Sequence, residues 1–107
     1  MDPKVVIGTG GYASAIPIKV GIKRNIPTMI QEQNSYPGLT TRLFAKKATT
    51  VFAGSEDSKI YLDTEINVTG NPTRNGIEKG SKELGFDIFQ LNSSLQTIFL
   101  FGGSQGS

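Results

Sequence analysis

The chain has 107 residues, which is enough for one small domain or for parts of two. It contains no cysteine and no histidine, which excludes disulfide bonds, thiolate metal sites and the commonest general base. A net charge of +2 is too small to indicate a nucleic-acid partner. No apolar run approaches the ~20 residues of a membrane span, and the first residues lack the features of a secretory signal.

Strand and helix patterns alternate through the first seventy residues. In chain order, we predict a strand at 4–7, a helix at 13–24, a strand at 26–31, a helix at 39–48, a strand at 49–53, a short helix at 55–62 and a strand at 65–69. This alternation is typical of an α/β fold with a Rossmann-like parallel sheet and flanking helices.

All three helices predicted in the first seventy residues carry more detailed predictions. Ser14 is expected to cap the first helix, and Ser55 the third, where acidic residues in the first turn suit the helix dipole. The helix at 39–48 is expected to bury one apolar face and expose one basic face. The apolar face consists of Leu39, Leu43 and Phe44. The basic face consists of Arg42, Lys46 and Lys47.

After Gly70 the pattern loosens. We predict a short helix at 78–85, an irregular segment at 87–95 and a buried strand at 97–101. The predicted domain boundary lies near 72–77, which gives a first segment 1–71, a linker with a short helix 72–96, and a final segment 97–107. Because the sequence enters a strand at once and stops in a glycine loop, both ends are expected to be cuts of a longer protein.

A glycine cluster between the first strand and the first helix is the first candidate binding site. Residues 8–14 include Gly8, Gly10, Gly11, Tyr12 and Ser14. Glycines there let the backbone approach an anion, which the helix N-terminus favours. Together with Glu32, the same cluster also fits a dinucleotide-binding fingerprint. A plain glycine turn is the alternative, and this motif alone does not decide between them.

Polar residues follow the second strand and the fourth. Glu32 can take a proton or bind a sugar, and the Gln33 and Asn34 amides can bind hydroxyl groups. The alternative is a simple turn into the next helix. Arg74 is suited to bidentate phosphate recognition, or else is a solvated linker residue.

A second glycine cluster, residues 102–107, follows the last predicted strand and contains Gly103, Ser104 and Gln105. Two such phosphate-binding loops facing a shared cleft would suit an enzyme with two phosphorylated substrates.

Basic residues on the first two helices form the densest positive group: Lys23, Arg24, Arg42, Lys46 and Lys47. Either these residues are simply the solvated side of the two helices, or they attract the protein weakly to an anionic membrane surface. Such an attraction is worth ~1 kcal/mol for each charge near the bilayer.

These motifs, in this order and over essentially the whole chain, resemble those of the MurG family of bacterial glycosyltransferases. The resemblance implies a two-domain GT-B architecture and inverting transfer of N-acetylglucosamine from UDP-N-acetylglucosamine to lipid I, giving lipid II in peptidoglycan synthesis. It implies a peripheral location at the cytoplasmic face of the bacterial inner membrane, and no cofactor or obligatory metal. Segment 1–71 would belong to the acceptor-side domain, and segment 97–107 would open the UDP-sugar-binding domain.

The resemblance also implies residue roles. The loop facing the acceptor diphosphate would contain Gly8, Gly10, Gly11, Tyr12 and Ser14. Donor contacts would come from Asn34, Arg74 and Ser104. Cleft-lining positions would be Gln33, Gly103 and Gln105. Glu32 is a weak catalytic candidate. Gln31 and Thr41 stand where the family commonly has histidine and asparagine, so no family role is carried to them. The isolated chain is expected to be inactive.

Two rival hypotheses remain open at this point. A UDP-N-acetylglucosamine epimerase shares the same architecture and would be separated by the absence of lipid II formation. A nicotinamide-binding oxidoreductase would use residues 8–13 and Glu32, but leaves 33–40, the 71–74 turn and the second glycine loop unexplained.

Overall fold

The computed structural model describes residues 2–102. The chain divides into two compact units, one that ends at Pro72 and one that begins at Thr73. The assignment of these units to particular domains of a larger transferase remains a prediction. Each unit is described by itself.

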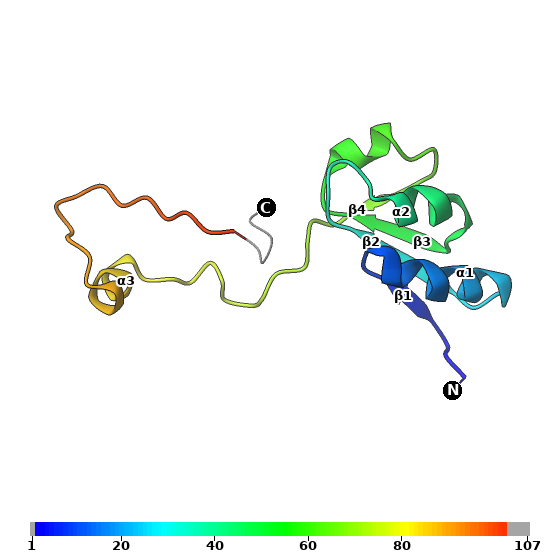
Figure 1. Cartoon of the computed structure of the whole chain (residues 1–107), viewed down its shortest axis with the longest axis horizontal. Coiled ribbons are helices and arrows are strands. Elements are labelled where there is room, and N and C mark those ends of the chain that lie inside the picture. The colour runs from blue at the N-terminus through cyan, green and yellow to red at the C-terminus, as the bar shows by residue number, and fades with distance from the viewer. Residues whose placement is uncertain (1, 103–107) are drawn as a thin grey trace. The chain divides into compact units, whose positions relative to one another are not determined.

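The first unit is built on a four-stranded parallel sheet in the order β1-β2-β3-β4 (Figure 1). The strands are β1 (Val6–Gly8), β2 (Thr28–Glu32), β3 (Thr50–Ala53) and β4 (Asn67–Val68). In the register, Val6 lies opposite Thr28, and Ile30 lies opposite Val51. The predicted Rossmann-like parallel sheet is confirmed, although each strand is shorter or shifted by one or two residues.

Helical segments connect successive strands. They are η1 (Tyr12–Ser14) with α1 (Ala15–Lys23), α2 (Leu39–Phe44) with η2 (Ala45–Lys47), and η3 (Glu56–Ile60). The strands follow one another across the sheet in chain order, always in the same direction. Right-handed crossovers therefore place all these connections on one face of the sheet. In β2 and β3 every second residue is buried, and Ile30, Val51 and Ala53 form one core there with Ile18 and Ala45.

The predicted apolar face of α2 is wrong at two of its three positions. Leu43 is 60% exposed and Leu39 is also exposed, whereas Thr40, Thr41 and Ala45 are buried. The helix is therefore rotated about its axis relative to the prediction. Polar contacts explain the rotation, because the Thr41 hydroxyl donates to Glu32 and the Thr40 hydroxyl donates to the Gly11 carbonyl. Phe44 is half-buried against the core as expected. The predicted basic face is exposed.

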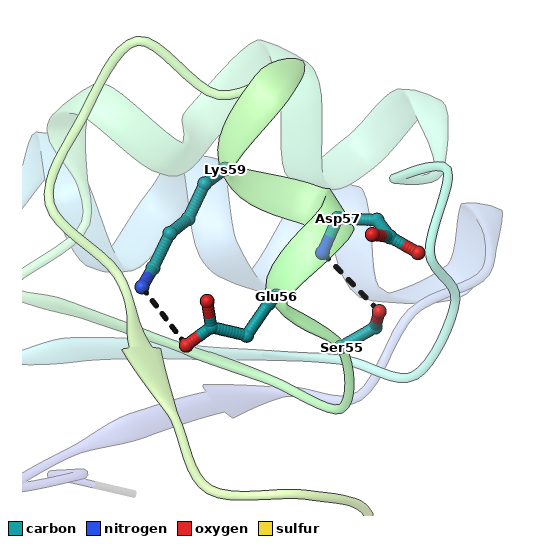
Figure 2. A network of polar contacts seen from close by, with 4 residues as sticks. All are labelled: Ser55, Glu56, Asp57 and Lys59. Carbon is teal, nitrogen blue, oxygen red and sulfur yellow. Dashed lines mark hydrogen bonds and ion pairs between the residues drawn. The ribbon is translucent and has the colours of Figure 1, made fainter.

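Two serine caps were predicted. Ser55 behaves as expected: its Oγ accepts a hydrogen bond from the Asp57 amide at 3.2 Å, while Lys59 pairs with Glu56 at 3.2 Å (Figure 2). The helix that it opens is 3-10 rather than α. Ser14 occupies the N-cap position of α1, but its hydroxyl donates to the Gly11 carbonyl instead of capping the helix.

The second unit contains one regular element, α3 (Lys82–Phe89), within its described residues. Its N-cap Ser81 accepts from the Leu84 amide at 3.2 Å, so the helix begins four residues later than the predicted start at 78. The predicted buried strand at 97–101 is wrong, since that segment forms no strand and Ile98 is 91% exposed. A strand needs a neighbour for its backbone hydrogen bonds, and residues 73–102 supply none.

Candidate functional site

A cavity of about 240 Å³ lies at the carboxyl ends of β1 and β2, the edge where open α/β sheets bind ligands. Three segments that are distant in sequence line it: the glycine loop after β1, the polar turn after β2 and the start of α2. The lining residues are Gly10, Gly11, Tyr12, Glu32, Gln33, Asn34 and Gly38 to Thr41. The fold therefore brings two of the predicted motifs into one cavity.

The glycine loop depends on left-handed backbone conformations at Gly10 (φ 97°) and Gly11 (φ 72°). Any other residue is strained there. Gln33 fastens this loop to the next strand, because its Nε2 donates to the Thr9 carbonyl at 3.0 Å and to the Gln31 carbonyl at 3.1 Å. The Thr40 hydroxyl adds a third tie, to the Gly11 carbonyl at 3.1 Å. The loop is thus held in shape by side chains from the polar turn after β2 and from α2.

Two predicted loop residues, Gly8 and Ser14, do not line the cavity. Gly8 is buried, and a Cβ placed on it would lie 2.3 Å from Ile18 Cδ1. Its place in the fold is the close packing of α1 on the sheet. Ser14 closes the turn from within, with its hydroxyl 2.9 Å from the Gly11 carbonyl oxygen.

Glu32 is the buried charge of the site, with only 3% of its surface exposed. Its Oε1 accepts from the Asn34 amide at 3.0 Å and from Asn34 Nδ2 at 3.2 Å. Its Oε2 accepts from the Gly38 amide at 2.9 Å and from Thr41 Oγ1 at 2.5 Å. Both carboxylate oxygens are therefore occupied by the turn and helix that they organise.

The ionisation of Glu32 follows from these contacts. Burial raises the pKa of this carboxyl, but hydrogen bonds from Thr41, Asn34 and Gly38 outweigh that effect and hold the pKa below its usual value. A carboxylate with a lowered pKa and two engaged oxygens is a poor proton acceptor at neutral pH. The geometry favours a structural role for Glu32 over the catalytic one considered from the sequence.

The polar turn is also held from the side of β3 and β4. Ser58, which is fully buried, donates from Oγ to the Asn34 carbonyl at 3.0 Å. Asn71 donates from Nδ2 to the Gln33 carbonyl at 3.2 Å. Asn71 packs so closely on β3 that a Cβ at Gly54 would lie 2.3 Å from its Oδ1. The backbone carbonyls of Gln33 and Asn34 are therefore each held by a side chain from another segment of the first unit.

Sequence reasoning missed four supporting residues: Thr40, Thr41, Ser58 and Asn71. The sequence did contain one indication that Thr41 supports the site. Thr28, Ile30 and Glu32 alternate along β2, so Glu32 lies on the same buried face as the other two. A buried carboxylate needs hydrogen-bond donors nearby, and the following helix is the nearest source of them. Of the predicted donor residues, Arg74 is exposed and belongs to the second unit. Gly103, Ser104 and Gln105 lie outside the described residues.

No group of three Asp or Glu side chains among residues 2–102 gathers as ligands for a metal ion. None of the helices described is long and apolar enough to cross a membrane.

Comparison with known proteins gives the class first. Residues 1–53 match the glycosyltransferase family 28 N-terminal domain. Strands β1 to β3, the glycine loop and every residue that lines the cavity lie within this matched segment.

More specific relatives carry the name UDP-N-acetylglucosamine–N-acetylmuramyl-(pentapeptide) pyrophosphoryl-undecaprenol N-acetylglucosamine transferase. That of Chlorobaculum tepidum is 45% identical over 99% of this chain and 29% of its own length. Those of Desulforamulus reducens and Christiangramia forsetii are 39% and 40% identical, over 99% and 98% of this chain and 29% and 30% of their own lengths. The chain is thus homologous to the MurG-type N-acetylglucosamine transferases over nearly all its residues, which confirms the resemblance, and it spans less than a third of their length.

Proposed function

We propose that this chain forms the acceptor-side part of an inverting transferase that moves N-acetylglucosamine from UDP-N-acetylglucosamine to lipid I, giving lipid II. The observation that carries the proposal is the cavity in which Gly10 and Gly11 meet Gln33 and Asn34. Homology over nearly the whole chain supports the same reaction. The cavity would hold the reacting ends of the two substrates.

Each end of the cavity suits a different part of those substrates. Backbone amides of the glycine loop, at the start of η1 and α1, favour an anion such as the acceptor diphosphate. The amide side chain of Asn34 suits a neutral sugar group. As the sugar moves to the acceptor hydroxyl, UDP departs and the hydroxyl proton needs a base. Arg74 and Ser104 are proposed to stabilise the departing diphosphate, and the base would be a group other than Glu32.

Peripheral attachment to an anionic membrane is the second part of the proposal. Lys23, Arg24, Arg42, Lys46 and Lys47 are not buried. Each would contribute ~1 kcal/mol near an anionic bilayer, enough for a weak and salt-sensitive attachment.

The nicotinamide-binding rival loses its main support in this structure. That hypothesis needs the Glu32 carboxylate free to bind a ribose, but both of its oxygens are engaged by Asn34, Gly38 and Thr41. No observation favours the epimerase rival, which the assay below also tests.

A chimera tests the proposed function. This chain replaces the matching segment of the Chlorobaculum tepidum relative, and transfer from UDP-N-acetylglucosamine to lipid I is measured. We expect lipid II to form, and to be lost when Gly11 is changed to Val. A chimera that folds but makes no lipid II, or that only epimerises the sugar nucleotide, would contradict the proposal.

A further inference from the structure

The orientation of the Asn34 side chain is fixed by its neighbour. A carboxylate can only accept hydrogen bonds, so the Asn34 atom that lies 3.2 Å from Glu32 Oε1 must be the Nδ2 donor. The carbonyl oxygen Oδ1 is therefore directed away from the carboxylate. Asn34 lines the cavity and is exposed, so this oxygen remains available to a ligand.

The Glu32 carboxylate is itself held by a single buried side-chain donor. Thr41 is 1% exposed, and its hydroxyl donates to Oε2, the oxygen that does not contact Asn34. The only other contact of Oε2 among the described residues is the Gly38 amide. Without the Thr41 hydroxyl, Oε2 would keep only the hydrogen bond from the Gly38 amide, so the plane of the carboxylate would be held less firmly.

The chemistry of this end of the cavity selects its ligand. Oδ1 of Asn34 is an acceptor, so its partner must be a hydroxyl or an N–H group. The buried negative charge of Glu32 opposes a phosphate at this end. A neutral sugar group satisfies both conditions, while the diphosphate is left to the glycine loop.

We propose that Thr41 is a positioning residue, which acts through Glu32 to present Oδ1 of Asn34 to a hydroxyl or acetamido N–H group of the donor sugar. This inference rests on the proposed function, because it takes UDP-N-acetylglucosamine as the ligand. It gives a role to a position at which this chain departs from the family pattern.

The test uses three variants. Thr41→Val keeps the shape but removes the donor, and Thr41→Ser keeps the hydroxyl. Thr50→Val is the matched control, because Thr50 is a half-buried strand residue whose side chain makes no hydrogen bond within the described part of the chain. NMR of the 107-residue chain is expected to show shifted Asn34 side-chain amide signals in Thr41→Val alone.

Kinetics of the chimera supply the second readout. We expect Thr41→Val to raise the KM for UDP-N-acetylglucosamine about tenfold, with kcat within about twofold, since one hydrogen bond of substrate binding is lost. Inhibition by UDP, which lacks the sugar, is expected to stay unchanged. Thr41→Ser and Thr50→Val are expected to behave as the parent.

The outcomes separate this inference from the proposed function. Unchanged Asn34 signals and an unchanged KM in Thr41→Val would overturn the inference alone. Equal weakening of UDP and UDP-N-acetylglucosamine would also overturn it, because a general structural loss would then explain the effect. An inactive parent chimera would contradict the proposed function, while the Asn34 signals would still decide the role of Thr41.

Discussion

Glu32 joins the sheet to the site. It ends β2 on the buried face, and its carboxylate takes four hydrogen bonds from the turn and helix that follow. Its charge can be buried because those donors replace the lost water. The position of this carboxylate at the end of a strand could be predicted from the sequence. Whether it is reactive or structural could not be predicted, because that depends on the hydrogen bond from the Thr41 hydroxyl.

Glu32→Gln is expected to destabilise the first unit by roughly 2–4 kcal/mol, because the new amide turns N–H groups towards buried donors. The folded-state pKa of Glu32 lies below its ordinary value of 4.5. The contribution of ionised Glu32 to the free energy of unfolding is therefore present above about pH 4.5 and is lost as the pH falls through the folded-state pKa. Urea unfolding from pH 3 to pH 7 measures this, and the difference in unfolding free energy between the two proteins should narrow as the pH falls below about 4.5. A difference that stays constant with pH would contradict the account, and the exposed Glu65→Gln is the control.

Gly10 shows how backbone conformation shapes the same cavity. At φ 97° a Cβ is strained, and it would also lie 3.2 Å from Gln33 Oε1. Gly10→Ala is expected to cost about 1–2 kcal/mol in unfolding free energy. Gly38→Ala is the control, because Gly38 has φ −63° and a Cβ there meets its nearest atom only at 3.8 Å. Equal effects of the two substitutions in chemical denaturation would argue against the left-handed loop.

The secondary elements of the first unit were largely predictable, since short apolar and β-branched runs bounded by turn residues define its strands. The rotation of α2 was not predictable. Leu39 and Leu43 are more apolar than Thr40 and Thr41, so periodicity assigned the wrong face. The threonines are buried because each makes a hydrogen bond to a distant segment. The 97–101 segment was misjudged for a different reason: an apolar run predicts burial, but a strand also needs neighbours that no local pattern supplies.

A matched pair of substitutions tests the orientation of α2 and η2. Leu43→Asn, on the exposed face, is expected to change the unfolding free energy by less than about 0.5 kcal/mol. Ala45→Asn, in the core, is expected to cost about 2 kcal/mol or more, because it buries an unpartnered amide among apolar side chains. Thermal unfolding followed by circular dichroism compares them. A larger loss for Leu43→Asn would restore the orientation predicted from periodicity.

At the scale of the whole molecule, every residue that lines the cavity belongs to the first unit, and the chain spans less than a third of the length of the relatives it matches. The predicted motifs are divided between the two units. The glycine loop and the polar turn meet within the first unit, and Arg74 belongs to the second. The first two meet because parallel strands bring their carboxyl ends to one edge of the sheet. From the sequence, the glycine loop was instead expected to share a cleft with residues 102–107, and that pairing stays a prediction.

The cavity between the glycine loop and the polar turn is proposed to receive the acceptor diphosphate. The most direct measurement is an NMR titration of the isotope-labelled chain with a short-chain, soluble analogue of N-acetylmuramyl-(pentapeptide) pyrophosphoryl-undecaprenol. If the diphosphate binds there, chemical-shift changes are expected only in the amides of Gly10, Gly11, Tyr12 and their neighbours in the cavity, and they should vanish in Gly11→Val. Changes that avoid this loop, or that persist in Gly11→Val, would rule out binding of the diphosphate at the glycine loop.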